Sequence, residues 1–294
     1  MQKVLVILGQ TATGKSDLSV AIAKKINGEI ISADSRQVYK GLDIGTGKIT
    51  SKEMKGIPHY LLDVANPKRK FNVSQYKKLA EKMVTNILSR GKVPIICGGT
   101  GFYIDALVSN IVLPQVPPNS KLRKQLEQKS TTALFYTLKK LDGERARNID
   151  AKNKVRLIRA IEIAKALGKV PHLETKLPNY QFIKIGLHLP KEKLQEKIST
   201  RLNKRIKVGM LTEALKLHSK GLCFTRMREL GLEYKYMALY LEKKISKDEM
   251  LAGLNKEIYQ YAKRQMTWFK RDESIKWFQP EDQAKIQKFL RGRF

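Results

Sequence analysis

The sequence has few of the residues that build disulfide frameworks or zinc sites. Its two cysteines, Cys97 and Cys223, lie far apart in a chain of 294 residues, and its four histidines have no metal-binding spacing. These absences exclude a disulfide-stabilised scaffold and a zinc-finger architecture, and they favour a reducing cytoplasmic location. They also give no indication of a catalytic histidine.

Long hydrophobic runs are missing as well. The apolar segment of residues 4–8 is too short to cross a membrane, and it leads into a glycine motif rather than a small-residue cleavage site. We therefore expect a soluble, unexported protein with no membrane partner.

Acidic residues are scarce relative to basic ones. The 58 Lys and Arg residues outnumber 27 Asp and Glu residues, giving a formal charge of +31, while 42% of all residues are hydrophobic. A chain this apolar is not a disordered basic tail, and its charge indicates a folded protein that binds a polyanion. An ordinary solvated, lysine-rich surface explains part of the excess.

Apolar patterning predicts an α/β fold. Compact apolar runs at 4–8, 29–33 and 93–97 are typical of strands buried in a parallel sheet. Helical spacing follows at 17–26 and 74–90, and a glycine comes soon after each segment. This alternation of strands and helices favours a doubly wound sheet.

The pattern changes after Leu113, where three prolines are followed by long charged helices. This change predicts a helical insertion in a chain long enough for about two domains of roughly 150 residues. We expect a discontinuous core domain of residues 1–118, 180–190 and 252–294, with a helical region of residues 119–179 and 191–251.

A capping box is expected in the second half, formed by Ser246 and Glu249. The other expected elements there are helices over 153–167, in several pieces over 191–240 and over 254–271, and strands over 182–189 and 275–278.

The most specific motif is a phosphate-binding loop between the first predicted strand and helix. Residues 9–16 read GQTATGKS, which fits the pattern G-x-x-x-x-G-K-[S/T]. Backbone N–H groups of such a loop point into a concavity, Lys15 adds a full positive charge, and Ser16 can hold Mg²⁺. We predict that a diphosphate binds to Gly9, Gln10, Thr11, Ala12, Thr13, Gly14, Lys15 and Ser16.

The loop alone leaves the reaction open, because hydrolysis, phosphoryl transfer and displacement of pyrophosphate all need the same cradle. The N-K-x-D and D-x-x-G motifs of switch GTPases do not occur. The strand over 93–97 leads into Gly98-Gly99-Thr100 and lacks the terminal Asp that is common beside this loop in ATPases. Both absences disfavour an ordinary GTPase or motor-type ATPase.

Two polar residues follow predicted strands at the sheet edge where ligands bind in α/β folds. Asp34 comes after the strand over 29–33, and Thr100 comes shortly after the strand over 93–97. The Asp34 carboxylate can accept a proton from a nucleophile, cap a helix or act as a secondary Mg²⁺ ligand. Thr100 can hydrogen-bond the same reacting centre or be an ordinary turn hydroxyl.

Basic and aromatic residues gather in three later segments. In the segment 263–271, Arg264, Trp268 and Arg271 share a helical face, which can contact phosphates and stack on a base. A solvated surface is the alternative for each segment. The other two segments contain Arg156 with Arg159, and Arg226 with Arg228.

Seven short motifs occur in a fixed order along nearly the whole chain. They are the loop over 9–16, SADS over 32–35, YKGLDIGT over 39–46, PHYLLD over 58–63, GGTGFY over 98–103, RLIRAIE over 156–162 and AKRQMTW over 262–268. This ordered set, which is far more specific than the loop alone, resembles the bacterial tRNA dimethylallyltransferases, also called tRNA isopentenyltransferases.

The resemblance implies a P-loop, nucleotide-kinase-like core with a parallel sheet and a helical insertion. It implies transfer of the dimethylallyl group from dimethylallyl diphosphate to N6 of the adenosine 3′-adjacent to the anticodon, with release of pyrophosphate. Asp34 would be the catalytic base and Thr100 would assist it. Lys15, the loop amides and Mg²⁺ on Ser16 would stabilise the leaving group. We also expect a monomer that binds the tRNA anticodon stem-loop and flips out the acceptor base.

The same resemblance implies tRNA contacts in several segments, with the helical region as the main tRNA-binding part. Arg36 and Gln37 differ from the small and aliphatic residues common at these positions of the family. The residues expected to contact tRNA are Asp34, Ser35, Arg36, Gln37, Arg123, Val155, Arg156, Leu157, Ile158, Arg159, Arg228, Lys263, Arg264, Gln265, Trp268 and Arg271.

Three other functions remain open at this point. A related enzyme that prenylates free adenine nucleotides would use the same loop and base, but a mononucleotide needs no extended basic surface. A nucleotide kinase would be identified by phosphate transfer or ATP hydrolysis. A non-catalytic RNA-binding protein would leave the intact loop and Asp34 unexplained.

Overall fold

The computed structural model describes residues 1–175, 177–178 and 180–294. Two compact units are present. The first, here called the sheet unit, comprises Met1–Asn110 and Leu177–Phe294, and the second, the helical unit, comprises Ile111–Lys176. Among the described residues, we find no helix with the length and apolarity needed to span a bilayer.

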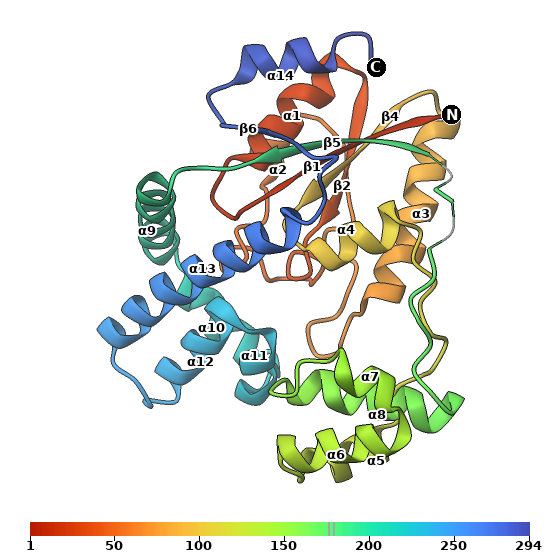
Figure 1. Cartoon of the computed structure of the whole chain (residues 1–294). Coiled ribbons are helices and arrows are strands. Elements are labelled where there is room, and N and C mark those ends of the chain that lie inside the picture. Colours follow the sequence, from red (N-terminus) through yellow and green to blue (C-terminus); the bar gives the residue numbers. More distant parts are fainter. Residues whose placement is uncertain (176, 179) are drawn as a thin grey trace. The chain divides into compact units, whose positions relative to one another are not determined.

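A parallel sheet of six strands forms the centre of the sheet unit, in the order β3-β2-β4-β1-β5-β6 (Figure 1). Leu8 of β1 and Ala33 of β2 both align with Gly98 of β4, so these three strands end at one edge. The predicted parallel sheet is confirmed, and the two-residue β3 is an addition to it. The strands are β1 (Lys3–Gly9), β2 (Gly28–Ala33), β3 (His59–Tyr60), β4 (Val93–Gly98), β5 (Gln181–Leu187) and β6 (Lys276–Phe278).

Both faces of the sheet are covered, which explains the unbroken apolar runs of its strands. Val4 and Val6 of β1 share a core with α3 (Val73–Ser89) and α4 (Gly101–Val108). Leu5, also from β1, shares the opposite core with helices on the other face. Those helices are α1 (Lys15–Lys25) and α14 (Gln283–Leu290).

Further helices of the sheet unit build a core of their own. The sequence pattern predicts that residues 191–251 belong with the insertion. In the structure they belong to the sheet unit, where they pack with Val38, Leu42 and residues of the long helix α13. The helices that build this core are α9 (Lys191–Lys207), α10 (Met210–Ser219), α11 (Phe224–Leu230), α12 (Leu232–Leu241) and α13 (Lys247–Phe269). The short helix α2 (Ser51–Met54) lies outside it.

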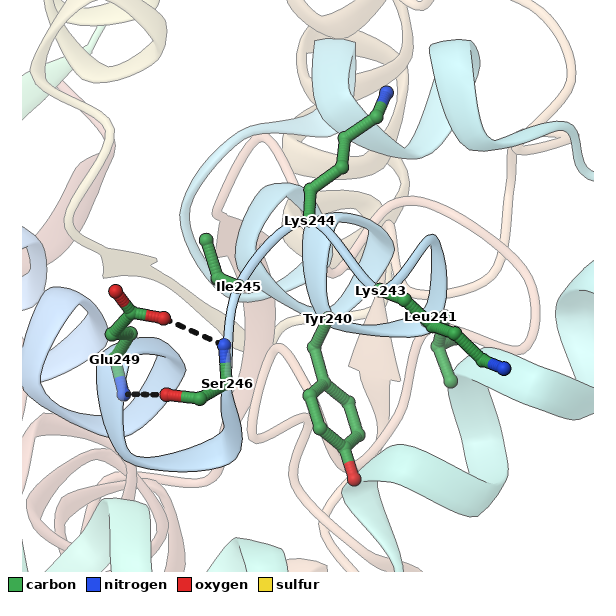
Figure 2. Close-up of a pocket in the computed structure, with 7 residues that line it drawn as sticks. All are labelled: Tyr240, Leu241, Lys243, Lys244, Ile245, Ser246 and Glu249. Carbon is green, nitrogen blue, oxygen red and sulfur yellow. Dashed lines mark hydrogen bonds between the residues drawn. The ribbon is translucent and has the colours of Figure 1, made fainter.

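The predicted capping box at the start of α13 is confirmed. Ser246 accepts a hydrogen bond from the Glu249 backbone N–H at 3.1 Å, and the Glu249 carboxylate accepts one from the Ser246 N–H at 2.7 Å (Figure 2). Helix α13 therefore begins seven residues before the predicted start at residue 254. The shallow pocket drawn around this cap is lined by groups that serve the helix start and the preceding turn.

The helical unit has a small apolar core in which Leu134, Leu138, Leu157 and Ile161 are fully buried. Side chains of Asn119, Ser130, Asp142 and Asn153 cap its four helices, as expected for these residue types. The predicted helical insertion is confirmed, and it includes residues 111–118, which the sequence placed in the core. The helices are α5 (Ser120–Glu127), α6 (Thr131–Leu141), α7 (Gly143–Arg147) and α8 (Lys154–Leu167).

Glu29 provides a test of how buried charge stabilises the sheet. Its side chain, only 1% exposed, accepts hydrogen bonds from Arg90, Lys92 and Tyr60, and chiefly the Arg90 bonds lower the pKa of Glu29 to about 2. Because the folded-state pKa lies below the unfolded value of 4.5, this stabilisation is present above pH 4.5 and is lost as the pH falls toward 2.

We therefore expect the wild-type protein to lose unfolding free energy more steeply than Glu29→Gln between pH 4.5 and 2. Urea denaturation at a series of pH values measures this difference. Glu81→Gln, which removes a more exposed carboxylate, should behave like the wild type. Parallel curves for wild type and Glu29→Gln would contradict the assignment.

Candidate functional site

A cavity of about 580 Å³ opens at the carboxyl ends of β1, β2 and β4. This edge of an open α/β sheet is where ligands generally bind. The cavity is lined by the loop after β1, the residues after β2 and β4, one face of α9 and part of α13. Segments that are far apart in the sequence thus meet at one place in the sheet unit.

The loop over residues 9–16 joins β1 to α1, as its motif requires. Gly9 has φ of 135°, and a Cβ atom there would lie 2.2 Å from the Leu187 carbonyl oxygen, so only glycine fits. The Thr13 hydroxyl and the Lys15 ammonium group both donate to the Gln10 carbonyl, at 2.8 and 2.5 Å. These contacts fold the loop around its own backbone and bring Lys15 to the cavity.

Gln265 of α13 connects the loop to the neighbouring strand end. Its Oε1 accepts a hydrogen bond from the Thr11 N–H at 2.8 Å, and its Nε2 donates to the Gly99 carbonyl at 2.9 Å. The side chain is almost completely buried. The sequence assigned Gln265 to tRNA contact, but this geometry makes it an internal strap between the segments after β1 and β4.

Asp34 and Thr100 are brought together at adjacent strand ends. Asp34 Oδ1 accepts hydrogen bonds from the N–H groups of Arg36 and Gln37 at 2.8 and 3.3 Å. Thr100 Oγ1 accepts one from the Ser35 N–H at 2.9 Å. Within the described residues, Asp34 Oδ2 has no hydrogen-bond donor, so the carboxylate fixes its turn with one oxygen and offers the other to a ligand.

Helix α9 contributes cations to the cavity that no motif in the sequence indicates. Arg201 approaches the Thr11 hydroxyl at 3.4 Å and the Gly47 carbonyl at 3.3 Å, while Lys197 and Lys204 line the same cavity. The helical spacing of 197, 201 and 204 indicates a shared face, but nothing local in the sequence shows that this face meets the phosphate loop.

Burial and neighbouring positive charges lower the pKa values of two cations in this cavity. Burial lowers the pKa of Lys15 to about 8, with a smaller contribution from the Arg201 charge, and burial together with Arg205 lowers the pKa of Arg201 to about 10. Both shifts show positive groups held close together in a poorly solvated place. A bound dianion or trianion would relieve this repulsion.

The lowered pKa of Lys15 predicts a pH-dependent affinity for anions. Below about pH 8 the ammonium group is charged, and above it the neutral amine must take up a proton to pair with a phosphate oxygen. We expect the affinity for inorganic pyrophosphate, measured by calorimetry from pH 6.5 to 9.5, to fall above pH 8 relative to that of Lys15→Met. The variant corrects for ionisation of pyrophosphate itself, and identical pH profiles would contradict the prediction.

The remaining residues assigned to tRNA in the sheet unit have varied positions. Gln37 lines the cavity, whereas Lys263 and Arg264 are exposed on α13. Trp268 donates to Asp105 at 2.9 Å, and the Arg271 guanidinium lies 4.0 Å from the centre of its ring. Arg36 and Ser35 follow Asp34, and Arg228 pairs with Glu242.

In the helical unit, several of the assigned residues maintain the fold. Arg123 and Arg159 both bind the buried carboxylate of Glu162, at 2.7 and 2.5 Å. Of their neighbours on α8, Leu157 and Ile158 are buried in the core, whereas Val155 and Arg156 are exposed.

The donor set of the cavity fits Mg²⁺ only together with a phosphate ligand. Among the described residues there is no cluster of three or more His, Cys, Asp or Glu side chains that would hold a metal alone. Ser16 and Asp34 do line the cavity beside the phosphate loop. Mg²⁺ typically takes one or two protein oxygens and completes its shell with phosphate oxygens and water, and this set matches that habit.

A phosphate loop and a carboxylate that share one cation-lined cavity define a P-loop α/β enzyme acting on a phosphorylated substrate. The family model described as IPP transferase matches residues 37–272. The chain therefore belongs to the IPP transferase family and is a prenyltransferase.

Similar proteins cover essentially the whole chain. The tRNA dimethylallyltransferase of Acetivibrio thermocellus is 40% identical, over 99% of this chain and 96% of its own length. The tRNA dimethylallyltransferase 2 of Treponema denticola is 44% identical, over 92% of both chains. The crystal structure of the tRNA isopentenylpyrophosphate transferase from Bacillus halodurans matches with a TM-score of 0.76 and 35% identity, covering 100% of this chain and 97% of that one.

A eukaryotic relative has the same fold. A eukaryotic dimethylallyltransferase acting on tRNA matches with a TM-score of 0.84 and 25% identity, over 99% of this chain and 78% of its own. The expected nucleotide-kinase-like core with a helical insertion is therefore shared with solved structures of tRNA prenyltransferases.

Proposed function

We propose that this protein transfers the dimethylallyl group from dimethylallyl diphosphate to N6 of the adenosine 3′-adjacent to the anticodon of a tRNA. The products are N6-isopentenyladenosine and pyrophosphate. The observation that supports this most directly is the placement of Asp34 beside the phosphate loop in one cavity, with Thr100 bonded to the turn that follows Asp34. Its volume of about 580 Å³ leaves room for both a diphosphate and a base.

The reaction needs a base because the adenine amine is a weak nucleophile, with its lone pair delocalised into the ring. Asp34 Oδ2 accepts the N6 proton while Oδ1 stays fixed by the Arg36 and Gln37 N–H groups. The bond from N6 to the first carbon of the dimethylallyl group forms, and the bond from that carbon to the diphosphate oxygen breaks. We assign Thr100, whose hydroxyl accepts the Ser35 N–H, the assisting role beside Asp34.

The electron pair of the broken bond leaves with pyrophosphate, so the protein must stabilise developing negative charge. Lys15, Arg201 and the loop N–H groups supply fixed positive charge and dipoles for this purpose. Mg²⁺ held by Ser16 and the diphosphate would neutralise further charge there.

Recognition of the tRNA is assigned to both compact units. We propose that Arg36 and Gln37 contact nucleotides next to the flipped acceptor base, and that Lys263 and Arg264 contact the RNA backbone. In the helical unit, Val155 and Arg156 are the exposed members of their stretch and the better candidates for contact with the anticodon stem-loop. We further propose that the protein acts as a monomer in the cytoplasm.

The decisive assay combines purified protein, Mg²⁺ and radiolabelled dimethylallyl diphosphate with an unmodified tRNA, with AMP or with no acceptor. We expect label on the tRNA and none when the target adenosine is replaced by guanosine. Label on AMP alone would identify a nucleotide prenyltransferase instead. If no transfer occurs, ATP hydrolysis and phosphate transfer are the next reactions to measure.

A further inference from the structure

The turn of residues 43–47 is held from one side by a single carboxylate. Glu213 of α10 accepts hydrogen bonds from the N–H groups of Asp43, Ile44 and Gly45 at 2.9, 2.7 and 2.9 Å. Tyr234 donates its hydroxyl to the same carboxylate at 2.6 Å. Three N–H groups of the turn therefore face α10, and two of its carbonyls bond to α9.

Two arginines of α9 bind those carbonyls. Arg205 donates to the Gly45 carbonyl at 3.3 Å, and Arg201, one helical turn earlier, donates to the Gly47 carbonyl at 3.3 Å. The packing is tight, because a Cβ atom on Gly47 would lie 1.7 Å from Arg205 Nη2. The two guanidinium groups both lie against Gly47, and each donates to a different carbonyl of the turn.

Glu233 of α12 supplies a negative charge that pairs with one of these two arginines. Its Oε1 lies 3.1 Å from Arg205 Nη1, and both side chains are only 12% exposed. Arg201 has its contacts elsewhere, on Thr11 of the phosphate loop. The buried carboxylate of Glu233 therefore neutralises Arg205, while Arg201 faces the cavity.

We propose that Glu233 is a positioning residue for the diphosphate, which pairs with Arg205 and thereby keeps Arg201 directed at the phosphate loop. This inference rests on the proposed function for the identity of the diphosphate substrate. Without Glu233, the poorly solvated Arg205 competes for the Gly47 carbonyl and repels Arg201, because like charges on adjacent helical turns destabilise each other.

The test uses inorganic pyrophosphate with Mg²⁺ as the ligand and calorimetry as the measurement. We expect Glu233→Gln to weaken pyrophosphate binding about tenfold, within the range of coupling between contacting residues. In an Arg201→Met background, the same substitution should have no further effect. Glu229→Gln breaks an ion pair with Arg226 outside the cavity and should bind pyrophosphate like the wild type.

A second variant separates positioning from general destabilisation. Arg205→Gln combined with Glu233→Gln leaves no unpaired buried charge, and we expect it to bind pyrophosphate more tightly than Glu233→Gln alone. Unchanged affinity in Glu233→Gln, or an equal loss in the Arg201→Met background, would overturn the inference. Absence of dimethylallyl transfer by the wild type would overturn the proposed function and leave this coupling measurable.

Discussion

Replacing Asp34 with asparagine is expected to lower the turnover number for dimethylallyl transfer by about 10²- to 10⁴-fold, the usual contribution of a positioned general base. Asparagine keeps an Oδ1 acceptor for the Arg36 and Gln37 N–H groups, so the turn after β2 should survive. What disappears is the oxygen that we propose takes the N6 proton. Pyrophosphate affinity should change little, because the proposed diphosphate site consists of the loop and the cations.

Single-turnover kinetics with saturating tRNA and dimethylallyl diphosphate measure the chemical step directly. Asp63→Asn is a matched control, because Asp63 pairs with Lys48 at 2.6 Å and does not line the cavity. Its rate should remain close to that of the wild type. Wild-type turnover in Asp34→Asn would exclude Asp34 as the base and leave it only its role in the turn.

Replacing Gln265 with leucine is expected to reduce pyrophosphate affinity strongly and to leave tRNA affinity nearly unchanged. The substitution removes both hydrogen bonds of the strap and leaves the Thr11 N–H and the Gly99 carbonyl without their partner. Each buried group left unpaired costs about 1–3 kcal/mol, so for the two groups we expect a loss of about 2–6 kcal/mol shared between folding and diphosphate binding.

Calorimetry with pyrophosphate, filter binding with tRNA and thermal unfolding together measure how this loss of free energy divides between ligand binding and folding. Gln287→Leu on α14 changes an exposed glutamine and should match the wild type in all three. A selective loss of tRNA binding in Gln265→Leu would instead restore the assignment of Gln265 to tRNA contact that its sequence motif implies.

The strands and the phosphate loop could be predicted because their signals are local. The apolar runs that become β1, β2 and β4 are continuous since both sheet faces are covered, and the loop lies directly between β1 and α1. Asp34 and Thr100 follow from the same logic, because parallel strands bring their carboxyl ends to one edge. The two-residue β3 is too short to leave a periodic pattern.

The predicted start of α13 at residue 254 was wrong, because α13 begins at Lys247 and continues through a glycine that serves tertiary packing. Gly253 lies just before the predicted start, yet it is inside the helix, where an added Cβ atom would lie 2.3 Å from the Tyr236 ring. The glycine permits a close approach between α13 and α12 instead of ending a helix. The capping box formed by Ser246 and Glu249 is the local pattern that places Gly253 inside the helix.

The long-range part of the site could not be read from the sequence. Arg201 lies 190 residues from Thr11, its partner in the phosphate loop, and Gln265 lies 254 residues from the same residue. Helical periodicity shows that residues 191–251 form amphipathic helices, but it does not show against which core their apolar faces pack. These contacts depend on the tertiary fold.

The helical unit leaves and rejoins the rest of the chain at neighbouring points. Within the sheet unit, Asn110 Nδ2 donates to the Leu177 carbonyl at 3.3 Å, and within the helical unit Ile111 pairs antiparallel with Thr175. The loss of chain entropy on joining α4 to β5 is therefore little greater with the insertion than with a short turn. Such a junction allows an insertion of different length or sequence at this point of the chain without moving the ends of α4 and β5.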